Sequence, residues 1–398
     1  MGRGGNGQSA SGVAGRKAVR GARAQVSATT ELCRDLAHVG AADRADVGGK
    51  AASLGELASA GVRVPPGFVV TTAAFGLAMA VTDPDGAARR DLERLGPPTA
   101  AEAGQTADPG ARMRERILAT ELPDAVRAEI GQSYRRIDDP GGGADDEAAV
   151  AVRSSATAED SDDASFAGLQ DTYLWVRGEA HVTASVRRCW ASLYSPEAAS
   201  YRARLPAGPA PGGEAPAMAV VIQQMVDARC AGVMFTCSPT TGDRSVVAVE
   251  ATWGLGSALV SGCVTPDSYV VSKVTGEIIK RTVPVKLRQH RRAADGTGVA
   301  EADVPGNLQG AACLTDDEIG ELARIALRVE QHYGRPQDIE WAIADGDAAG
   351  VFVLQSRPET VWAGREAAPV AVPKRRAFDH VFERLSGSAY HGHGGTAR

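Results

Sequence analysis

Three side chains near the end of the sequence have the types and spacing that nucleotide chemistry needs: Glu340, Gln355 and Arg357. Two short apolar runs, residues 339–344 and 351–354, flank an Asp-Gly-Asp segment, which predicts two antiparallel strands joined by a turn. Adjacent strands would hold the three side chains close together. A carboxylate and an amide oxygen suit a hard cation such as Mg²⁺, and a guanidinium suits a phosphate. The segment therefore predicts a site for a nucleoside triphosphate, and a hairpin with a surface ion pair is the alternative it leaves open.

A second candidate phosphate site lies near the start of the chain, where Gly48, Gly49 and Lys50 precede a predicted helix. Glycine lets backbone N–H groups approach a phosphate closely, and a helix N-terminus adds partial positive charge. Lys50 can then reach the terminal phosphates. The spacing is not that of a P-loop, so an ordinary glycine turn before a helix remains the alternative.

Two further segments carry polar groups that suit a ligand. Arg153 lies at the end of a short predicted strand, beside a cluster of hydroxyl residues, and is a candidate phosphate clamp. Residues 165–173, which include Thr172, are predicted to form a loop able to fold over a ligand. A polar turn that satisfies its own backbone is the alternative for both segments.

A fourth segment could contact a base. Residues 221–226 and 231–236 are predicted to form two neighbouring strands with a polar edge. In a nucleotide pocket the backbone after Gln223 could hydrogen-bond the adenine edge, with Met225 packing on the ring. Taken singly, these residues are better explained as sheet core.

Composition limits the classes of protein to consider. The chain has 398 residues, 43% hydrophobic and 23% charged, which is ordinary for a globular protein with two or three subdomains. A net charge of -6 argues against nucleic acid or an anionic membrane as the main partner. Six scattered cysteines without a CxxC pair favour reduced thiols, and hence a cytoplasmic protein, over a disulfide framework or zinc site. No stretch approaches 18 uninterrupted apolar residues, so no transmembrane helix is predicted.

The elements that must position the candidate residues form a predicted α+β body with mostly antiparallel sheet. Short β-branched runs between residues 217 and 283 predict strands, and Thr275-Gly276 turns the last two into a hairpin. A capping box at residues 315–318 opens a helix that Gly334 ends.

Together and in this order, the four segments resemble the ATP-binding domain shared by pyruvate phosphate dikinase, phosphoenolpyruvate synthase and rifampicin phosphotransferase. Further matches are VRVPPGFVVTT at residues 62–72, RRCWASLYSPEAASY at 187–201, WGLG at 253–256 and VTPD at 264–267. The resemblance spans roughly residues 36–361. It implies an ATP-grasp-type fold in which two subdomains hold the nucleotide in a cleft between them.

The resemblance also implies roles for individual residues, with ATP and Mg²⁺ as the bound species. It implies phosphate contacts from Lys50, Arg153 and Arg357, further nucleotide contacts from Gly49 and Thr172, an adenine-side hinge at Gln223, Gln224, Met225 and Val226, and Mg²⁺ ligands in Glu340 and Gln355. One departure is Ser257, a position where the family frequently has glutamate.

The family splits ATP into AMP and passes the β-phosphate to a histidine on a swivelling domain, which then phosphorylates pyruvate or another acceptor. Only 36 residues follow Trp362, and they lack the context of that histidine loop and of the acceptor-binding domain. We therefore expect an ATP-binding phosphotransferase subunit that charges a histidine on a separate partner protein and works with a separate acceptor-binding domain. The alternative is a truncated or non-catalytic ATP-binding module.

The expected organisation has four parts. Residues 1–28, which contain five basic and no acidic residues, are predicted to be a disordered leader. Residues 31–216 and 217–362 are the two predicted subdomains, and residues 363–398 are predicted to be a disordered tail.

Overall fold

The computed structural model describes residue 1 and residues 31–90, 109–137, 147–157, 172–199, 217–344 and 350–362. Contacts divide the chain into two units, Met1–Glu31 and Leu32–Arg398, and every helix and strand below belongs to the second. The predicted leader and tail lie outside the described residues. Among the described helices, none is long and apolar enough to cross a membrane.

The strands form two large sheets, in which every neighbouring pair is antiparallel. The five-stranded sheet contains, in spatial order, β1 (Cys33–Asp35), β2 (Gly67–Val70), β5 (Met218–Gln224), β3 (Val150–Ala156) and β4 (Thr172–Val176). The six-stranded sheet contains β13 (Gly350–Pro358), β12 (Gln337–Ala344), β6 (Ala228–Phe235), β7 (Val246–Trp253), β8 (Asp267–Ser272) and β9 (Ile278–Thr282). A separate hairpin pairs β10 (Arg288–Arg292) with β11 (Val299–Asp303). The predicted α+β class is confirmed.

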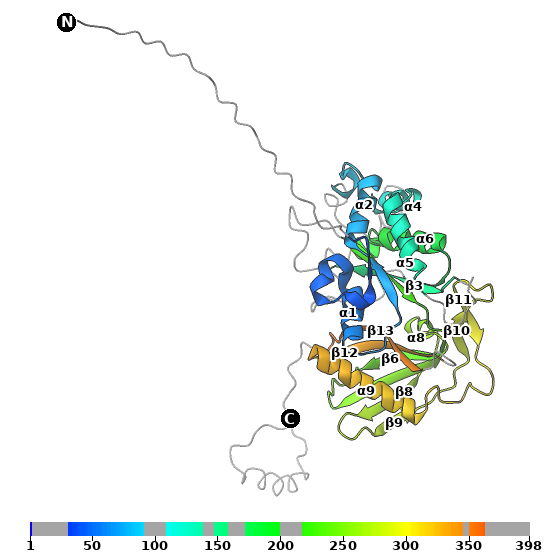
Figure 1. Cartoon of the computed structure of the whole chain (residues 1–398). Helices are drawn as coiled ribbons and strands as arrows, with labels where there is room; N and C mark the ends of the chain where they lie inside the picture. The colour runs from blue at the N-terminus through cyan, green and yellow to red at the C-terminus, as the bar shows by residue number, and fades with distance from the viewer. Residues whose placement is uncertain are drawn as a thin grey trace, which may run out of the picture. The chain divides into compact units, whose positions relative to one another are not determined.

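Helices cover both faces of the five-stranded sheet. One face packs against α2 (Thr72–Thr82), α4 (Pro109–Ala119), α5 (Asp124–Tyr134) and α6 (Glu179–Ser192), which Figure 1 shows gathered on one side. The other face packs against α1 (Arg44–Ser59), which two short 3₁₀ turns precede, η1 (Leu36–His38) and η2 (Ala41–Asp43). Because side chains alternate along a strand, Val150 and Val152 of β3 enter the core beneath the four helices.

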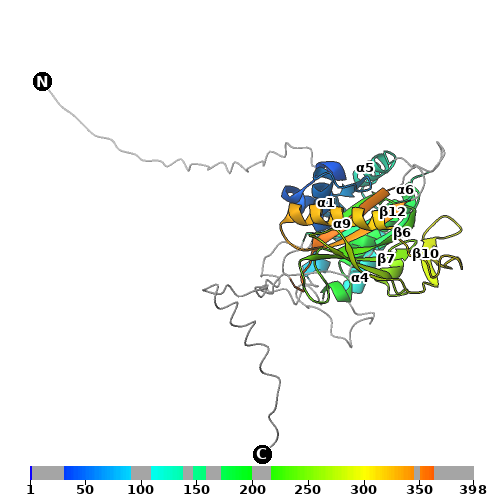
Figure 2. The same cartoon turned by 90° about the horizontal axis from the view of Figure 1, so that it is seen from below.

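A long helix packs on one face of the six-stranded sheet. This helix, α9 (Asp316–Tyr333), begins at the predicted capping box, where Thr315 and Glu318 each accept from the other's backbone N–H. It ends at Gly334, whose φ of 67° is left-handed, as predicted for a helix stop. Figure 2 shows α9 crossing β12 and β6, and its apolar side packs on their buried residues. A short helix, α8 (Ser257–Val260), follows β7.

The prediction that β5 and β6 are neighbouring strands is wrong. β5 pairs with β2 and β3, whereas β6 pairs with β7 and β12, so residues 225–227 carry the chain from one sheet to the other. An apolar run indicates that a strand is buried but does not select its partner, and each of these strands has neighbours on both edges in its own sheet. The predicted subdomain boundary at residue 217 stays a prediction, although the passage between the sheets lies after β5.

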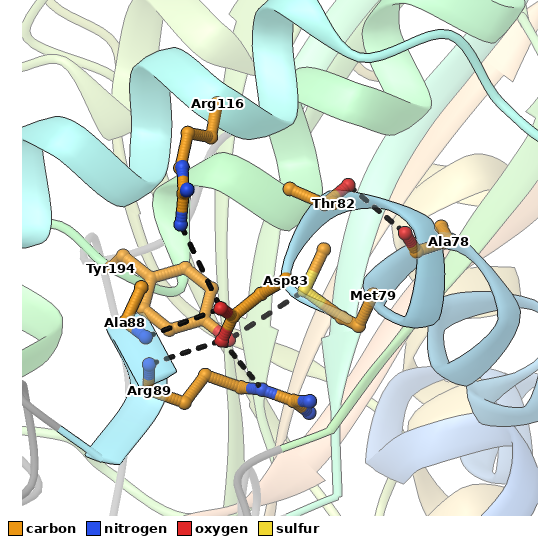
Figure 3. Close-up of polar contacts among 8 residues, drawn as sticks. All are labelled: Ala78, Met79, Thr82, Asp83, Ala88, Arg89, Arg116 and Tyr194. Atoms are coloured by element: carbon orange, nitrogen blue, oxygen red, sulfur yellow. Dashed lines mark hydrogen bonds and ion pairs between the residues drawn. The ribbon is translucent and has the colours of Figure 1, made fainter. Parts of the chain in front are cut away.

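One buried carboxylate ties the helices of the five-stranded sheet together. Asp83, 2% exposed, follows α2 and accepts from the backbone N–H groups of Ala88 and Arg89, each at 3.2 Å (Figure 3). The guanidinium of Arg116 on α4 lies 3.7 Å away. Burial would raise the pKa of Asp83, but the two backbone donors and the Arg89 side chain outweigh it, so the pKa lies below its usual value.

Candidate active site

The β12–β13 hairpin places the predicted residues on one face. Glu340 pairs with Gln355, and Asp338 pairs with Arg357 two positions along. Residues two apart on a strand face the same way, so these four side chains share the face opposite the α9 core. The predicted antiparallel hairpin is confirmed, while its Asp-Gly-Asp turn lies outside the described residues.

Arg153 of β3 joins this face from the other sheet. Its Nη2 donates to Glu340 Oε2 at 3.0 Å and to Gln355 Oε1 at 2.6 Å, and its Nη1 donates to the Leu354 carbonyl at 2.8 Å. Two oxygens thus converge on one nitrogen. Arg153 lies in the middle of β3, not at the end of a strand as predicted, because the strand continues to Ala156.

The burial of Arg153 makes these contacts energetically important. The residue is 9% exposed, and a buried guanidinium needs neutralisation, which Glu340 supplies. Within the described part of the chain, the Nε of Arg153 is buried without a hydrogen-bond partner. Such orphaned donors are rare and call for an explanation such as a bound ligand or water.

A second ion pair lies beside the first. Arg357 donates from Nε to Asp338 Oδ2 at 2.8 Å, and its Nη2 lies 2.7 Å from the same oxygen. Burial raises the pKa of Asp338, and Arg357 offsets this only in part. The pKa of Glu250 on β7 is also raised, by burial and then by the charge of Asp338. Asp338 is not among the predicted site residues, although its place in the sequence two residues before Glu340 puts both on the same face of a strand.

The donor set of Glu340 and Gln355 fits Mg²⁺. Their oxygens already meet at one cationic group, and carboxylate and amide oxygens are hard ligands. Among the residues the structure describes, no group of three or more His, Cys, Asp or Glu side chains could hold a metal ion. Mg²⁺ commonly takes only one or two carboxylates and completes its shell with substrate phosphates and water. The pair therefore matches a metal site shared between protein and substrate.

Lys50 lies in the first turn of the regular part of α1. Gly48, with φ 75° and ψ 174°, interrupts the helix, so Gly49 and Lys50 follow a glycine turn as predicted. A Cβ at Gly48 would lie 2.1 Å from the Ser155 carbonyl oxygen, which restricts this position to glycine. The Ser155 hydroxyl accepts from the Ala51 N–H at 3.3 Å. The strand that carries Arg153 therefore also contacts the start of the helix that carries Lys50.

The predicted adenine hinge lies at the end of β5. The Gln223 side chain is buried and donates to a neighbouring carbonyl. The backbone N–H groups of Gln224 and Met225 are also engaged, each donating to a carbonyl at 2.9 Å. For the Val226 N–H, the described residues offer no hydrogen-bond partner. Of the predicted hinge residues, Val226 is therefore the candidate whose backbone N–H could donate to the adenine edge.

A small apolar cluster adjoins this hinge and joins the two sheets. Met225 and Val226 pack there with Leu174 of β4 and Leu354 of β13. Small side chains from the six-stranded sheet, such as Ala231, complete it. An apolar wall next to converging polar groups is the usual composition of a small-molecule site.

A cavity lies beside this region rather than in it. Its volume is about 620 Å³, and it is lined by residues of β4, α6 and the β10–β11 hairpin. Of the eleven predicted site residues, all of them described, Thr172 alone lines it; Thr172 is also the register partner of Arg153. Ser257 lines the same cavity and lies 2.9 Å from His290 Nδ1. This cavity therefore does not identify the candidate active site. The contacts of Arg153 with Glu340 and Gln355 identify it.

Comparison with known proteins agrees with this geometry. A family model described as pyruvate phosphate dikinase, AMP/ATP-binding domain, matches residues 44–377, and the chain belongs to this family. A probable phosphoenolpyruvate synthase of Methanothermobacter thermautotrophicus is 45% identical over 313 residues, covering 79% of this chain and 44% of that protein. A rifampicin phosphotransferase of a Streptomyces species is 43% identical over 330 residues, covering 83% of this chain and 36% of that protein.

A third relative gives the same result. The phosphoenolpyruvate synthase of Aeropyrum pernix is 39% identical over 356 residues, covering 82% of this chain and 42% of that protein. The resemblance inferred from the sequence motifs is confirmed. The chain spans less than half the length of these three relatives.

Proposed function

We propose that this chain binds ATP with Mg²⁺ in a cleft between two ATP-grasp-type subdomains and uses it for phosphotransfer. The observation that carries the proposal is the convergence of Glu340 Oε2 and Gln355 Oε1 on Arg153 Nη2, across the two sheets. Membership in a family named for AMP/ATP binding supports the choice of nucleotide. The names of the relatives, which are phosphoenolpyruvate synthases and a rifampicin phosphotransferase, support phosphotransfer.

Each residue then has a role that its chemistry allows. Glu340 and Gln355 would hold Mg²⁺, which when bound withdraws negative charge from phosphate oxygens. Lys50 and the two guanidinium groups of Arg153 and Arg357 neutralise the triphosphate and align it. Phosphoryl transfer depends mainly on such positioning and charge, because the protein has little covalent chemistry to perform.

The hinge and the apolar cluster would hold the base. The Val226 N–H donates to the adenine edge, while Met225 and Leu354 contact the ring. Gly49 and Thr172 lie beside the phosphates in this proposal. Glycine at position 49 allows close approach of the backbone.

The acceptor of the phosphoryl group is a histidine on a separate protein. In this proposal the imidazole nitrogen attacks the β-phosphorus, the bond between that phosphorus and the oxygen of AMP breaks, and AMP leaves. Water then cleaves the bond to the γ-phosphate, which leaves as inorganic phosphate, so that the β-phosphoryl group remains on the histidine. The partner then delivers the phosphoryl group to a substrate held by a further domain, as the phosphoenolpyruvate synthase names of the relatives suggest.

The test uses ATP labelled at the β-phosphate. The chain is incubated with Mg²⁺, labelled ATP and the proteins it retains from a native lysate. We expect AMP to accumulate and an alkali-stable, acid-labile label to appear on a second protein. The Arg357→Ala variant is the control for site-dependent transfer.

Three outcomes separate the possibilities. Label on a second protein, lost with Arg357→Ala, supports transfer in trans. Label on the chain itself would contradict the separate acceptor. Tight ATP binding without AMP under all conditions would favour a non-catalytic nucleotide-binding module instead.

A further inference from the structure

A chain of hydroxyl groups connects α1 to β13 and to the end of α9. The Ser53 hydroxyl donates to the Ser356 carbonyl at 2.9 Å and lies 3.1 Å from the Tyr333 hydroxyl. The Tyr333 hydroxyl donates to the Ser53 carbonyl at 3.3 Å and also has a hydrogen bond with the Glu56 side chain. Each hydroxyl has one proton, so Tyr333 shares its proton among Ser53 and Glu56 while Ser53 donates to Ser356. Ser53 therefore contacts both the last residue of α9 and the backbone of β13.

The two ends of this chain lie next to the candidate active site. Ser53 is three residues after Lys50 on the same helix, so both side chains lie on one side of α1. Ser356 is the residue between Gln355 and Arg357 on β13. One hydroxyl thus fixes the lysine helix to the strand that carries a metal-ligand candidate and a phosphate-clamp candidate.

The same contact covers an open sheet edge. β13 is the outermost strand of the six-stranded sheet, and carbonyls two residues apart point to the same edge. The Leu354 carbonyl on that edge accepts from Arg153, and the Ser356 carbonyl accepts from Ser53. Two side chains from α1 and β3 therefore hold one edge at two successive points. The relative position of Lys50, Arg153 and Gln355 depends on both.

Tyr333 can sustain this arrangement at any physiological pH. Burial raises its pKa to about 12; the hydrogen bond with Ser53 lowers the pKa, while the charge and hydrogen bond of Glu56 raise it. The hydroxyl therefore stays protonated and keeps its role as donor. Its ring is anchored as the last residue of α9, which packs on the six-stranded sheet.

We propose that Ser53 and Tyr333 are positioning residues for the nucleotide site, which hold Lys50 in register with Gln355 and Arg357. Neither side chain needs to touch the nucleotide. The proposal rests on the proposed ATP-binding function and adds the device that aligns the two halves of the site.

The first test compares four variants of the full chain by calorimetric titration with Mg·ATP. Ser53→Ala and Tyr333→Phe should each raise the dissociation constant for Mg·ATP by about three- to tenfold, which is the effect of one lost hydrogen bond. Ser53→Thr, which keeps the hydroxyl, should recover most of the affinity. Tyr134→Phe is the matched control, because the buried Tyr134 hydroxyl of α5 donates at 2.6 Å to the Ala148 carbonyl, just before β3, and accepts from a backbone N–H just before α6. Neither of these partners belongs to α1 or β13. It should leave the affinity unchanged.

The second test asks whether Ser53 acts through Lys50. In the Lys50→Ala background, Ser53→Ala should cost little further affinity, since the group it positions is gone. Additive losses would overturn the positioning role. Affinity losses no larger than that of Tyr134→Phe at equal loss of melting temperature would overturn it as well.

Failure of this inference is distinguishable from failure of the proposed function. If the unmodified chain binds no Mg·ATP, both the proposed function and the positioning role are wrong. If the unmodified chain binds and Lys50→Ala weakens it, while Ser53→Ala and Tyr333→Phe do not, only the positioning role falls.

Discussion

The two faces of strand β3 have opposite compositions. Val150 and Val152 enter a core sealed by four helices, whereas Arg153 and Ser155, at the alternate positions, meet polar groups of α1 and the six-stranded sheet. One strand thus serves stability with one set of residues and the candidate site with the other. Substitutions on the two faces should therefore have separable effects.

The two faces also differ in their buried carboxyl groups. On the helical side Asp83 accepts from two backbone N–H groups, and its pKa lies below the usual value. On the site side burial raises the pKa values of Asp338 and Glu250. Among the described residues, buried N–H and O–H groups without a partner occur on both sides, such as Arg187 Nε on α6 and Arg153 Nε on β3, so the carboxyl groups carry the contrast. Raised carboxyl pKa values are common at functional sites.

The largest effect should come from the helical face. Trp190 is fully buried and its ring lies 5.6 Å from that of Phe75, edge to face. Its indole donates to the Met218 carbonyl at 3.0 Å. Trp190→Ala should lower the free energy of unfolding by about 4 kcal/mol, because it leaves a large cavity and an unbonded Met218 carbonyl. Urea unfolding followed by circular dichroism measures this.

If the folded fraction of Trp190→Ala still binds Mg·ATP with normal affinity, the helical face of β3 contributes to stability and not to nucleotide binding. Trp190→Phe, which leaves a smaller cavity, serves as the milder form if the alanine variant does not fold. A tenfold loss of ATP affinity in the phenylalanine variant at unchanged stability would contradict the separation of the two faces.

The second effect should come from the site face. Glu340→Gln keeps the shape of the side chain but removes the charge that faces Arg153 and the proposed Mg²⁺. We expect AMP formation with the partner to fall by about 100-fold, the usual cost of removing a group that stabilises transferring phosphate charge. The measurement is the initial rate of AMP release at saturating Mg·ATP.

Glu301→Gln is the matched control for that loss. Glu301 pairs with Arg288 on the exposed β10–β11 hairpin, where solvent screens the interaction. Its substitution should change neither the rate nor the melting temperature. Equal rate losses in both variants would indicate a general charge effect and would remove the special role of Glu340.

A smaller effect should come from Asp83. The pKa of this carboxyl lies below its unfolded value, so its contribution to stability is present above that unfolded value, about 3.9, and is lost as pH falls through the folded value. Asp83→Asn should cost about 1–2 kcal/mol near neutral pH. The difference from the unmodified chain should shrink below pH about 4.

Urea unfolding at a series of pH values measures this dependence. A constant difference between the two proteins down to pH about 3 would show that hydrogen-bonding geometry, not charge, is what Asp83 contributes.

Local patterns in the sequence predicted much of the fold. The capping box at Thr315 and the stop at Gly334 act within one helix, and the hairpin that pairs Glu340 with Gln355 needs only a short turn. Such features depend on neighbours in the chain, so a single sequence contains them. The residue types of the site followed from the same segments.

Long-range geometry could not be predicted in this way. The separation of β5 from β6 depends on pairing with strands far away in the sequence. The hydrogen bond from the Ser53 hydroxyl to the Ser356 carbonyl joins residues 303 positions apart, and a serine on a helix gives no indication of such a distant partner. Arg153 was predicted as a phosphate clamp, but its contacts with Glu340 and Gln355 depend on how the two sheets meet.

Calorimetric titration of the chain with ATP, with and without Mg²⁺, tests the central claim most directly. We expect saturable binding at one site that requires Mg²⁺ and weakens at least tenfold in Glu340→Gln. The same titration with Glu301→Gln should match the unmodified chain. No binding in the presence of Mg²⁺, or equal binding by the unmodified chain and Glu340→Gln, would contradict the assignment of Glu340, Gln355 and Arg153 as a magnesium–nucleotide site.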